Sequence, residues 1–344
     1  IEGQEELKFF TVYLKDLLRL GATGNEISFL NPPQPVGLPA GVIADFPEVS
    51  FYTPVIRPID HLYNLNRIQT PPFRTVNPET KSDVRLANQF INILKKWTSV
   101  TTYQSGSGVP SHNIQLNIND ILPIYAAIFD WLDKDAEIYD SSIYGTIGVE
   151  KNTYRSIDPY FEIKNGFLDK LSEVQLISGV KDKRIPLDQW KKGFTIFPVG
   201  NKYETQADFS AIKPRINVNL ATFEEIVEFL EKFNQNTAYF INYSPGYDDS
   251  ISQDYFEKRE EIAAELTKQP RSKLTSEDIK NKLSNITQYD RSRDFFIPHS
   301  FWYEILLMTE IDNVKAKVRA VVSVDRNAAT GKVSNLVIHN FFLR

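Results

Sequence analysis

The chain has 344 residues, 42% of them hydrophobic and 24% charged, which is ordinary for a globular protein and long enough for about one to three domains with cores of their own. Its formal net charge of -5 excludes the overall positive field that nucleic-acid-binding proteins use. The absence of cysteine excludes disulfides, thiolate metal sites and cysteine nucleophiles, and the four histidines lack the spacing of a multi-histidine metal centre. No run of about 20 apolar residues, as a membrane-spanning helix needs, is present.

The N-terminal part predicts one helix and the first strands of a sheet. In residues 5–23 apolar side chains recur near helical spacing. Residues 31–49 are rich in proline and predict an extended loop. Residues 49–68 are β-like, but Pro54 and Pro58 interrupt them, and this favours edge strands or bends.

The middle of the chain is expected to be mostly helical. The expected helices lie at residues 79–97, at 118–132, within 165–180, after a strand and turn within 214–233, at 260–269 and at 274–286. Their expected N-caps include Asn119 or Asp120, Thr222 in a capping box with Glu225, and Thr275 or Ser276. This part therefore predicts a helical region between β-like ends.

The C-terminal part predicts strands. Residues 315–344 alternate apolar and polar, with Val318, Ala320, Val322 and Val324 on one face and a hairpin turn at residues 325–332. Residues 301–313 are apolar almost throughout and fit a strand or a helix equally well. With strands at both ends and helices between them, the expected fold class is α+β with a large helical insertion.

Four segments in a fixed order carry a resemblance to a known family. They are DHLYNLNRI (60–68), AAIFDWLDKDAEIYD (126–140), YRSIDPYFEIKNGFLDKLSEVQLISGV (154–180) and INVNLATFEEIVEFL (216–230). In order and wording they resemble the GspK family of type II secretion minor pseudopilins. Two positions depart from the family pattern. The acid-rich run expected after the second segment reads GTIGVEKNTY here (145–154), and the fourth segment has LAT (220–222) without proline.

The resemblance implies a pilin-like α+β fold: an N-terminal helix on a small antiparallel sheet, with a large inserted α-helical, SAM-like domain. The implied domains are 1–75, the soluble half of the pilin helix with the first strands; 76–295, the helical insertion; and 296–344, the last strands. The chain begins at Ile1 without methionine, so we expect an inner-membrane anchor in a missing N-terminal part of the helix, with this portion in the periplasm.

The resemblance also implies a role without catalysis. Such a protein caps the tip of the type II secretion pseudopilus, helps to start its assembly for protein export, and binds two other minor pseudopilins, GspI-like and GspJ-like. Two alternatives remain open from the sequence: a calcium-dependent binding or adhesive tip domain of a related pilus system, and a secreted carbohydrate-active enzyme, since any acidic chain supplies carboxylate pairs. No nucleophile elbow, phosphate-binding loop or dinucleotide fingerprint supports another enzyme class.

Carboxylates crowd together where the expected helix at 118–132 ends, although a helix C-terminus favours cations. Calcium takes six to eight oxygen ligands, and members of the resembled family can bind calcium in the helical domain. The candidate calcium ligands are Asp130, Asp133, Asp135, Glu150 and Asn152. The alternative is a solvated loop in which Asp130 accepts hydrogen bonds from the backbone.

The expected N-terminal helix has more apolar surface than one face can bury, so part of it is a candidate surface for partners. The candidate partner-binding residues are Phe9, Phe10, Val12, Tyr13 and Leu17. Some of them are expected to pack on the protein's own sheet as well.

Two further segments favour structural roles. The dipeptide Asn165-Gly166 is a strong turn signal, and Phe167, Leu168 and Leu171 are expected in the core. The segment 216–230 has the outline of a helix-hairpin-helix DNA-binding unit, but it carries Glu224, Glu225 and Glu228, with Glu231 directly after it, where phosphate binding needs basic residues. No nucleic-acid partner is therefore expected.

Overall fold

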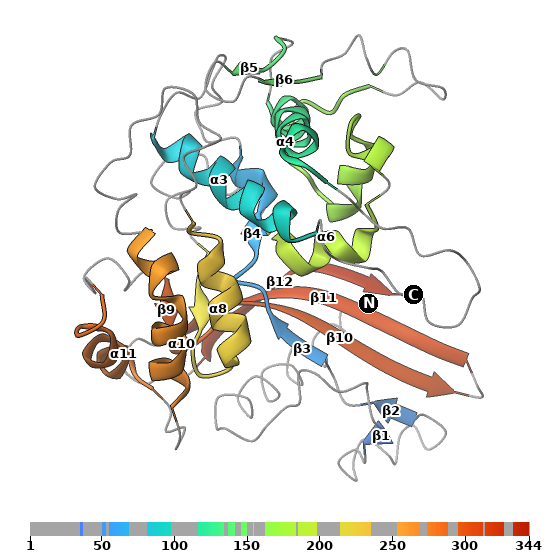
Figure 1. Cartoon of the computed structure of the whole chain (residues 1–344). Coiled ribbons are helices and arrows are strands. Elements are labelled where there is room, and N and C mark those ends of the chain that lie inside the picture. The colour runs from blue at the N-terminus through green and yellow to red at the C-terminus, as the bar shows by residue number, and fades with distance from the viewer. Residues whose placement is uncertain are drawn as a thin grey trace, which may run out of the picture. The chain divides into compact units, whose positions relative to one another are not determined.

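A computed structural model gives the fold (Figure 1), with the chain divided into two compact units: residues 1–60 with 299–344, and residues 61–298. It describes residues 35–36, 50–52, 55–68, 81–97, 116–133, 137–141, 146–149, 154, 162–183, 185–197, 214–234, 253–268, 274–287, 295–311, 314–326 and 333–343. Within these ranges, no helix combines the length and the hydrophobicity needed to cross a bilayer. The described elements are α-helices, short 3-10 helices and mostly antiparallel strands, and they confirm the α+β class.

The first unit is built on an antiparallel sheet. Its strands are β1 (Pro35–Val36), β2 (Ser50–Tyr52), β3 (Val55–Pro58), β10 (Trp302–Ile311), β11 (Val314–Arg326) and β12 (Val333–Leu343). The order is β1-β2-β10-β11-β12, and β3 pairs with β10 beside β2. The three long strands lie side by side in Figure 1 (orange-red). The ambiguous apolar run at 301–313 is thus mainly strand β10.

The sheet has one apolar face and one face that mixes apolar and charged side chains, which we call the mixed face. The two faces differ because successive side chains of a strand point to opposite sides. On the apolar face Ile305, Ala320 and Val322 have no exposed surface, which confirms the face expected for β11. On the mixed face Glu304 and Arg319 form an ion pair between β10 and β11. The alternation that the sequence shows at residues 315–344 therefore belongs to a sheet that is buried on one side.

The helical unit contains two hydrophobic cores. The first is formed by the helices α3 (Lys81–Lys96), α4 (Ile118–Leu132) and α6 (Leu187–Gly193), the 3-10 helices η1 (Leu65–Arg67) and η3 (Leu171–Leu176), and the parallel strands β4 (Tyr63–Asn64) and β7 (Phe194–Thr195). The 3-10 helix η4 (Lys181–Lys183) follows η3 at the surface. Aromatic rings fill the centre of this core: Trp190 and Phe194 have ring centroids 5.1 Å apart, and Phe90 and Phe194 5.3 Å. Such contacts add to the free energy gained from burial.

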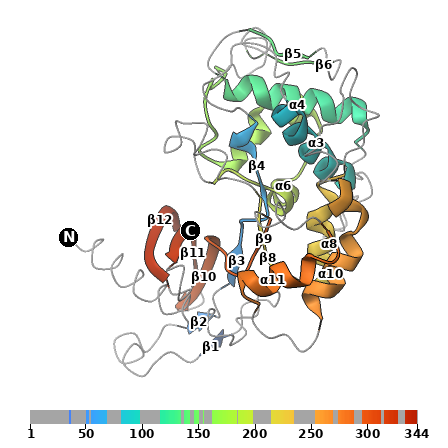
Figure 2. The same cartoon turned by 90° about the vertical axis from the view of Figure 1, so that its left-hand side faces the viewer.

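The second core lies between α8 (Phe223–Glu231), α10 (Arg259–Thr267), α11 (Ser276–Leu283) and the parallel strands β8 (Ile216–Asn217) and β9 (Phe296–Ile297). Figure 2 shows these helices as one group and α3 and α4 as another. Thr222 with Glu225 caps α8 in a capping box, and Thr275 with Asp278 caps α11, so both predicted caps are confirmed.

The helical unit is inserted between two strands that are neighbours in the sheet. The chain leaves the sheet after β3, and it returns at β10, which pairs with β3. We expected domain boundaries after residues 75 and 295; the division between compact units falls after Asp60 and Pro298. The segment 61–68, expected with the first strands, thus belongs to the inserted unit.

Asp60 connects the segment where the chain leaves the sheet to the segment where it returns. Its carboxylate Oδ1 accepts the N–H groups of Phe301 and Trp302 at 3.1 and 3.2 Å, and Ile59 N–H donates to the Trp302 carbonyl at 3.0 Å. Burial raises the pKa of Asp60 to about 6, although the N–H groups of Phe301 and Trp302 and the Ser300 hydroxyl favour the carboxylate. Near neutral pH the ionised Asp60 carboxylate therefore lowers the free energy of unfolding.

Candidate functional site

The aspartate segment begins with helix α4, whose N-cap is Asn117. The Asn117 side chain accepts the N–H of Asp120 at 3.2 Å, and the Asp120 carboxylate accepts the N–H of Asn117 at 3.0 Å. The predicted cap, Asn119 or Asp120, was therefore wrong; Asp120 instead closes the capping box. The hydrogen bond with Lys183 is the main cause that lowers the pKa of Asp120, and the N–H of Asn117 adds to it. The ion pair of Asp120 and Lys183 also connects this end of α4 to η4.

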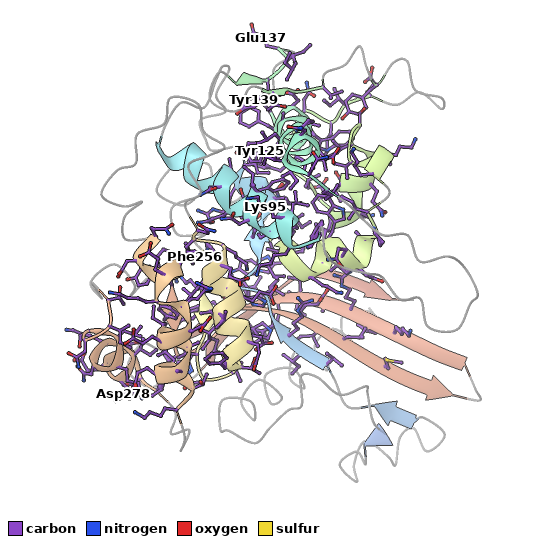
Figure 3. All side chains as sticks on the ribbon, in the orientation of Figure 1. Lys95, Tyr125, Glu137, Tyr139, Phe256 and Asp278 are labelled. Atoms are coloured by element: carbon purple, nitrogen blue, oxygen red, sulfur yellow. The ribbon has the colours of Figure 1, made fainter. Side chains whose placement is uncertain are left out.

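Asp130, near the end of α4, has no exposed surface and holds a short hairpin against the helix. Its Oδ1 accepts the N–H of Tyr139 at 2.8 Å. The Tyr139 ring lies 4.5 Å from the ring of Phe129, and Figure 3 shows it next to α4, with Glu137 further out. The hairpin strands are β5 (Asp140–Ser141) and β6 (Thr146–Ile147).

Gly148 allows the hairpin to approach Asp130 closely, because the Asp130 carboxylate occupies the space that a side chain on residue 148 would need. A Cβ atom on Gly148 would stand 2.0 Å from Asp130 Oδ2, which no side chain could occupy. The N–H of Gly148 donates to the Tyr139 carbonyl at 2.7 Å. Asp130 thus has the backbone-accepting role that the sequence left open as the alternative to metal binding.

Asp133 is the C-cap of α4 and is 3% exposed. It and Asp130 are the two candidate calcium ligands that the structure describes; Asp135, Glu150 and Asn152 lie outside the described residues. Within the described ranges no three acidic or histidine side chains gather closely enough to hold a metal ion. The calcium prediction therefore stays a prediction.

The candidate partner-binding residues, Phe9, Phe10, Val12, Tyr13 and Leu17, also lie outside the described residues. The partner-binding surface on the N-terminal helix stays a prediction too.

The third segment forms a turn that packs against the second. Asn165 has a positive φ of 46°, as its strong turn signal predicts. The N–H of Gly166 then donates to the Trp131 carbonyl at 3.1 Å. Leu168 is fully buried, with Phe167 and Leu171 packed against the same core, so their expected core positions are confirmed.

The first segment contains an arrangement that we call an asparagine clamp: an Asn-x-Asn sequence whose second side chain joins two distant parts of the backbone. Asn64 Oδ1 accepts the N–H of Asn66 at 3.0 Å. Asn66 Nδ2 donates to the carbonyls of Leu168 at 3.1 Å and Ile196 at 3.0 Å, and Asn66 Oδ1 accepts the N–H of Leu168 at 2.8 Å. The clamp therefore links β4, β7 and the turn of the third segment.

The fourth segment contains a second asparagine clamp with the same bonds. Asn217 Oδ1 accepts the N–H of Asn219 at 3.0 Å. Asn219 Nδ2 donates to the carbonyls of Leu274 at 2.9 Å and Pro298 at 3.0 Å, and its Oδ1 accepts the N–H of Leu274 at 2.8 Å. The two cores of the inserted unit are thus built on one repeated plan.

The strand pairing shows that the repeat extends beyond the asparagines. Tyr63 pairs with Phe194 in the first core and Ile216 with Phe296 in the second, both in parallel. In each core the clamp also binds a carbonyl two residues after the paired phenylalanine, which is Ile196 in the first core and Pro298 in the second. The sequence analysis did not identify this repeat, although YNLN (63–66) and INVN (216–219) share the pattern that could have revealed it.

Comparison with known proteins yields a structural likeness alone. No protein-family model matches the sequence, and no curated protein matches it. Among solved structures, the chain resembles one chain of the GspK-GspI-GspJ complex from the type 2 secretion system of enterotoxigenic Escherichia coli. The likeness covers 98% of this chain and 99% of that chain, with a TM-score of 0.48 and 13% sequence identity. At this level of similarity it assigns no function to the present chain.

Proposed function

We propose that this protein is a minor pseudopilin of the GspK type, which acts in a type II secretion pseudopilus without catalysing a reaction. The observation that carries the proposal is that the first three segments of the sequence resemblance meet in one core. Asn66 of the first segment binds Leu168 of the third, and Gly166 of the third binds Trp131 of the second. Because these segments contact one another in the core, they determine how the chain folds there. Their occurrence in the same order as in the GspK family therefore supports a fold like that of the family.

The topology supports the same proposal. A pilin-like protein with a helical insertion requires an antiparallel sheet that the chain leaves and re-enters, and β3 and β10 are such neighbouring strands. In this proposal the inserted unit is SAM-like, and the helix expected at residues 5–23 packs on the apolar face of the sheet. The protein sits at the tip of the pseudopilus, faces the periplasm and helps to start assembly with GspI-like and GspJ-like partners.

Gene deletion in the bacterium that carries this chain tests the role. Proteins that depend on type II secretion should then accumulate in the periplasm, and the full-length gene should restore their release. Export across the inner membrane serves as the control and should be unchanged. Normal release of these proteins from the deletion strain would contradict the proposal.

We further propose that the loop after α4 binds calcium through Asp133, Asp135, Glu150 and Asn152, with Asp130 beside them as the anchor of the hairpin. Carboxylate and amide oxygens are the ligands that calcium prefers, and Asp133 is already held at the helix end. Titration calorimetry with Ca²⁺ should give binding heat that the Asp133→Ala/Asp135→Ala variant lacks.

The matched control for this titration is Asp188→Ala. Asp188 is an exposed carboxylate of α6 that pairs with Lys191, and its replacement should leave the heat unchanged. A wild-type protein without binding heat would contradict the calcium proposal and leave the pseudopilin proposal intact.

A further inference from the structure

The two hydrophobic cores of the inserted unit are connected by polar contacts from one side of α3. Among the described residues, no buried apolar side chain belongs to both cores. Asn88, Asn92 and Lys96 of α3 are spaced four residues apart and therefore lie on one side of the helix. All three side chains bind the C-terminal end of α8, the helix that lies beside α3 in Figures 1 and 2. We call these three residues the α3 latch.

The two asparagines supply hydrogen bonds that the end of α8 lacks. The last carbonyl groups of a helix have no donor within the helix. Asn88 Nδ2 and Asn92 Nδ2 donate to the Asn234 carbonyl at 2.8 and 2.7 Å. Asn92 Nδ2 also donates to the Lys232 carbonyl at 3.3 Å. Both asparagines are buried, so the first core provides the cap of a helix that belongs to the second.

Lysine residues join the same two elements by charge. Lys96 Nζ donates to the Glu228 carbonyl at 3.2 Å and forms an ion pair with Glu231. A helix C-terminus carries partial negative charge and favours a cation, and the last turn of α8 contains no basic residue of its own. In the opposite direction, Lys232 Nζ donates to the His61 carbonyl at 2.7 Å. The contact between the cores is therefore made of hydrogen bonds and an ion pair.

We propose that the α3 latch is a conformational device, which makes the two cores one rigid unit when closed and lets the second core move and unfold by itself when open. The polar contacts support this, because they can break without separating a shared hydrophobic core, which would expose apolar surface to water. The inference concerns the fold alone, and it stands or falls independently of the pseudopilin role.

Native-state hydrogen exchange of the whole chain in low urea tests the latch, with Asn88→Ala/Asn92→Ala as the variant. The amides of α10 and α11 report on the second core and those of α4 on the first. In the wild type the two groups should lose protection together. In the variant the α10 and α11 amides should exchange at least about tenfold faster, while the α4 amides change by less than about threefold.

The matched control is Asn119→Ala, because Asn119 is an exposed asparagine of α4, and its replacement should leave both groups of amides unchanged. Equal acceleration in both cores would show that the two asparagines stabilise the fold as a whole, and it would overturn the inference. Acceleration confined to α8 would show local fraying of one helix end and would overturn it as well.

Lys96→Ala provides the same test if the double variant does not fold, because the Lys96 side chain is 29% exposed and its loss leaves the asparagines in place. It should accelerate exchange in α10 and α11 by about threefold or more and spare α4. Equal exchange in Lys96→Ala and wild type would overturn the inference.

A distance measurement follows the opening itself. The chain has no cysteine, so spin labels can be placed at Asp188→Cys in the first core and Glu260→Cys in the second, both exposed positions. Double electron-electron resonance should give a narrow distribution of distances in this background and a broader one after Asn88→Ala/Asn92→Ala. Distributions of equal width would overturn the inference.

Discussion

Replacement of Asn66 by alanine tests whether the first asparagine clamp holds its core together. Asn66 has no exposed surface, and its side chain makes three hydrogen bonds of 2.8–3.1 Å to Leu168 and Ile196. Each buried hydrogen bond contributes about 1 kcal/mol net, and the backbone groups left behind cannot reach water. Asn66→Ala should therefore lower the free energy of unfolding by about 3 kcal/mol.

Urea unfolding followed by tryptophan fluorescence measures this loss, because Trp97, Trp131 and Trp190 all lie in the first core. The matched control is Asn119→Ala, since Asn119 is exposed on α4 and its replacement should change the free energy by at most about 0.5 kcal/mol. A loss below about 1 kcal/mol for Asn66→Ala would refute the reasoning that the clamp stabilises this core.

Three further substitutions test other parts of the fold. Burial raises the Asp60 pKa to about 6, above its value of about 4 in unfolded chains. The free energy of unfolding should therefore fall by up to about 3 kcal/mol as pH rises from about 4 to above 6; Asp60→Asn should remove this fall, and equal pH profiles would contradict it. Gly148→Ala should cost about 1–3 kcal/mol in urea unfolding because its methyl group meets Asp130, and wild-type stability would count against that contact. Thr222→Ala removes the cap of α8 and should lower the free energy of unfolding by about 1 kcal/mol. An unchanged thermal unfolding temperature would contradict this prediction.

Local chemistry accounts for the features that could be predicted from the sequence. The caps at Thr222 and Thr275 depend on residues three positions away, and the buried face of β11 follows from alternation alone. The segment β10 carries large apolar residues on both faces, so its pattern could not distinguish a strand from a helix.

Long-range contacts account for the features that could not be predicted. Asn66 binds residues 102 and 130 positions away, and no local pattern encodes such partners. Oδ1 of Asp130 accepts the N–H of Tyr139, nine residues away, and the carboxylate lies against Gly148, and neither contact could be predicted from the sequence. Carboxylate crowding alone could not separate a hairpin anchor from a metal ligand.

The mass of the assembled complex tests the proposed pseudopilin role most directly. This chain has a mass of 39.5 kDa. Light scattering after size-exclusion chromatography should measure the mass of the chain alone and in a mixture with the soluble domains of a GspI-like and a GspJ-like minor pseudopilin from the same bacterium. The proposed function predicts one complex whose mass is the sum of one copy of each protein. Elution of this chain at 39.5 kDa in the presence of both domains would contradict it.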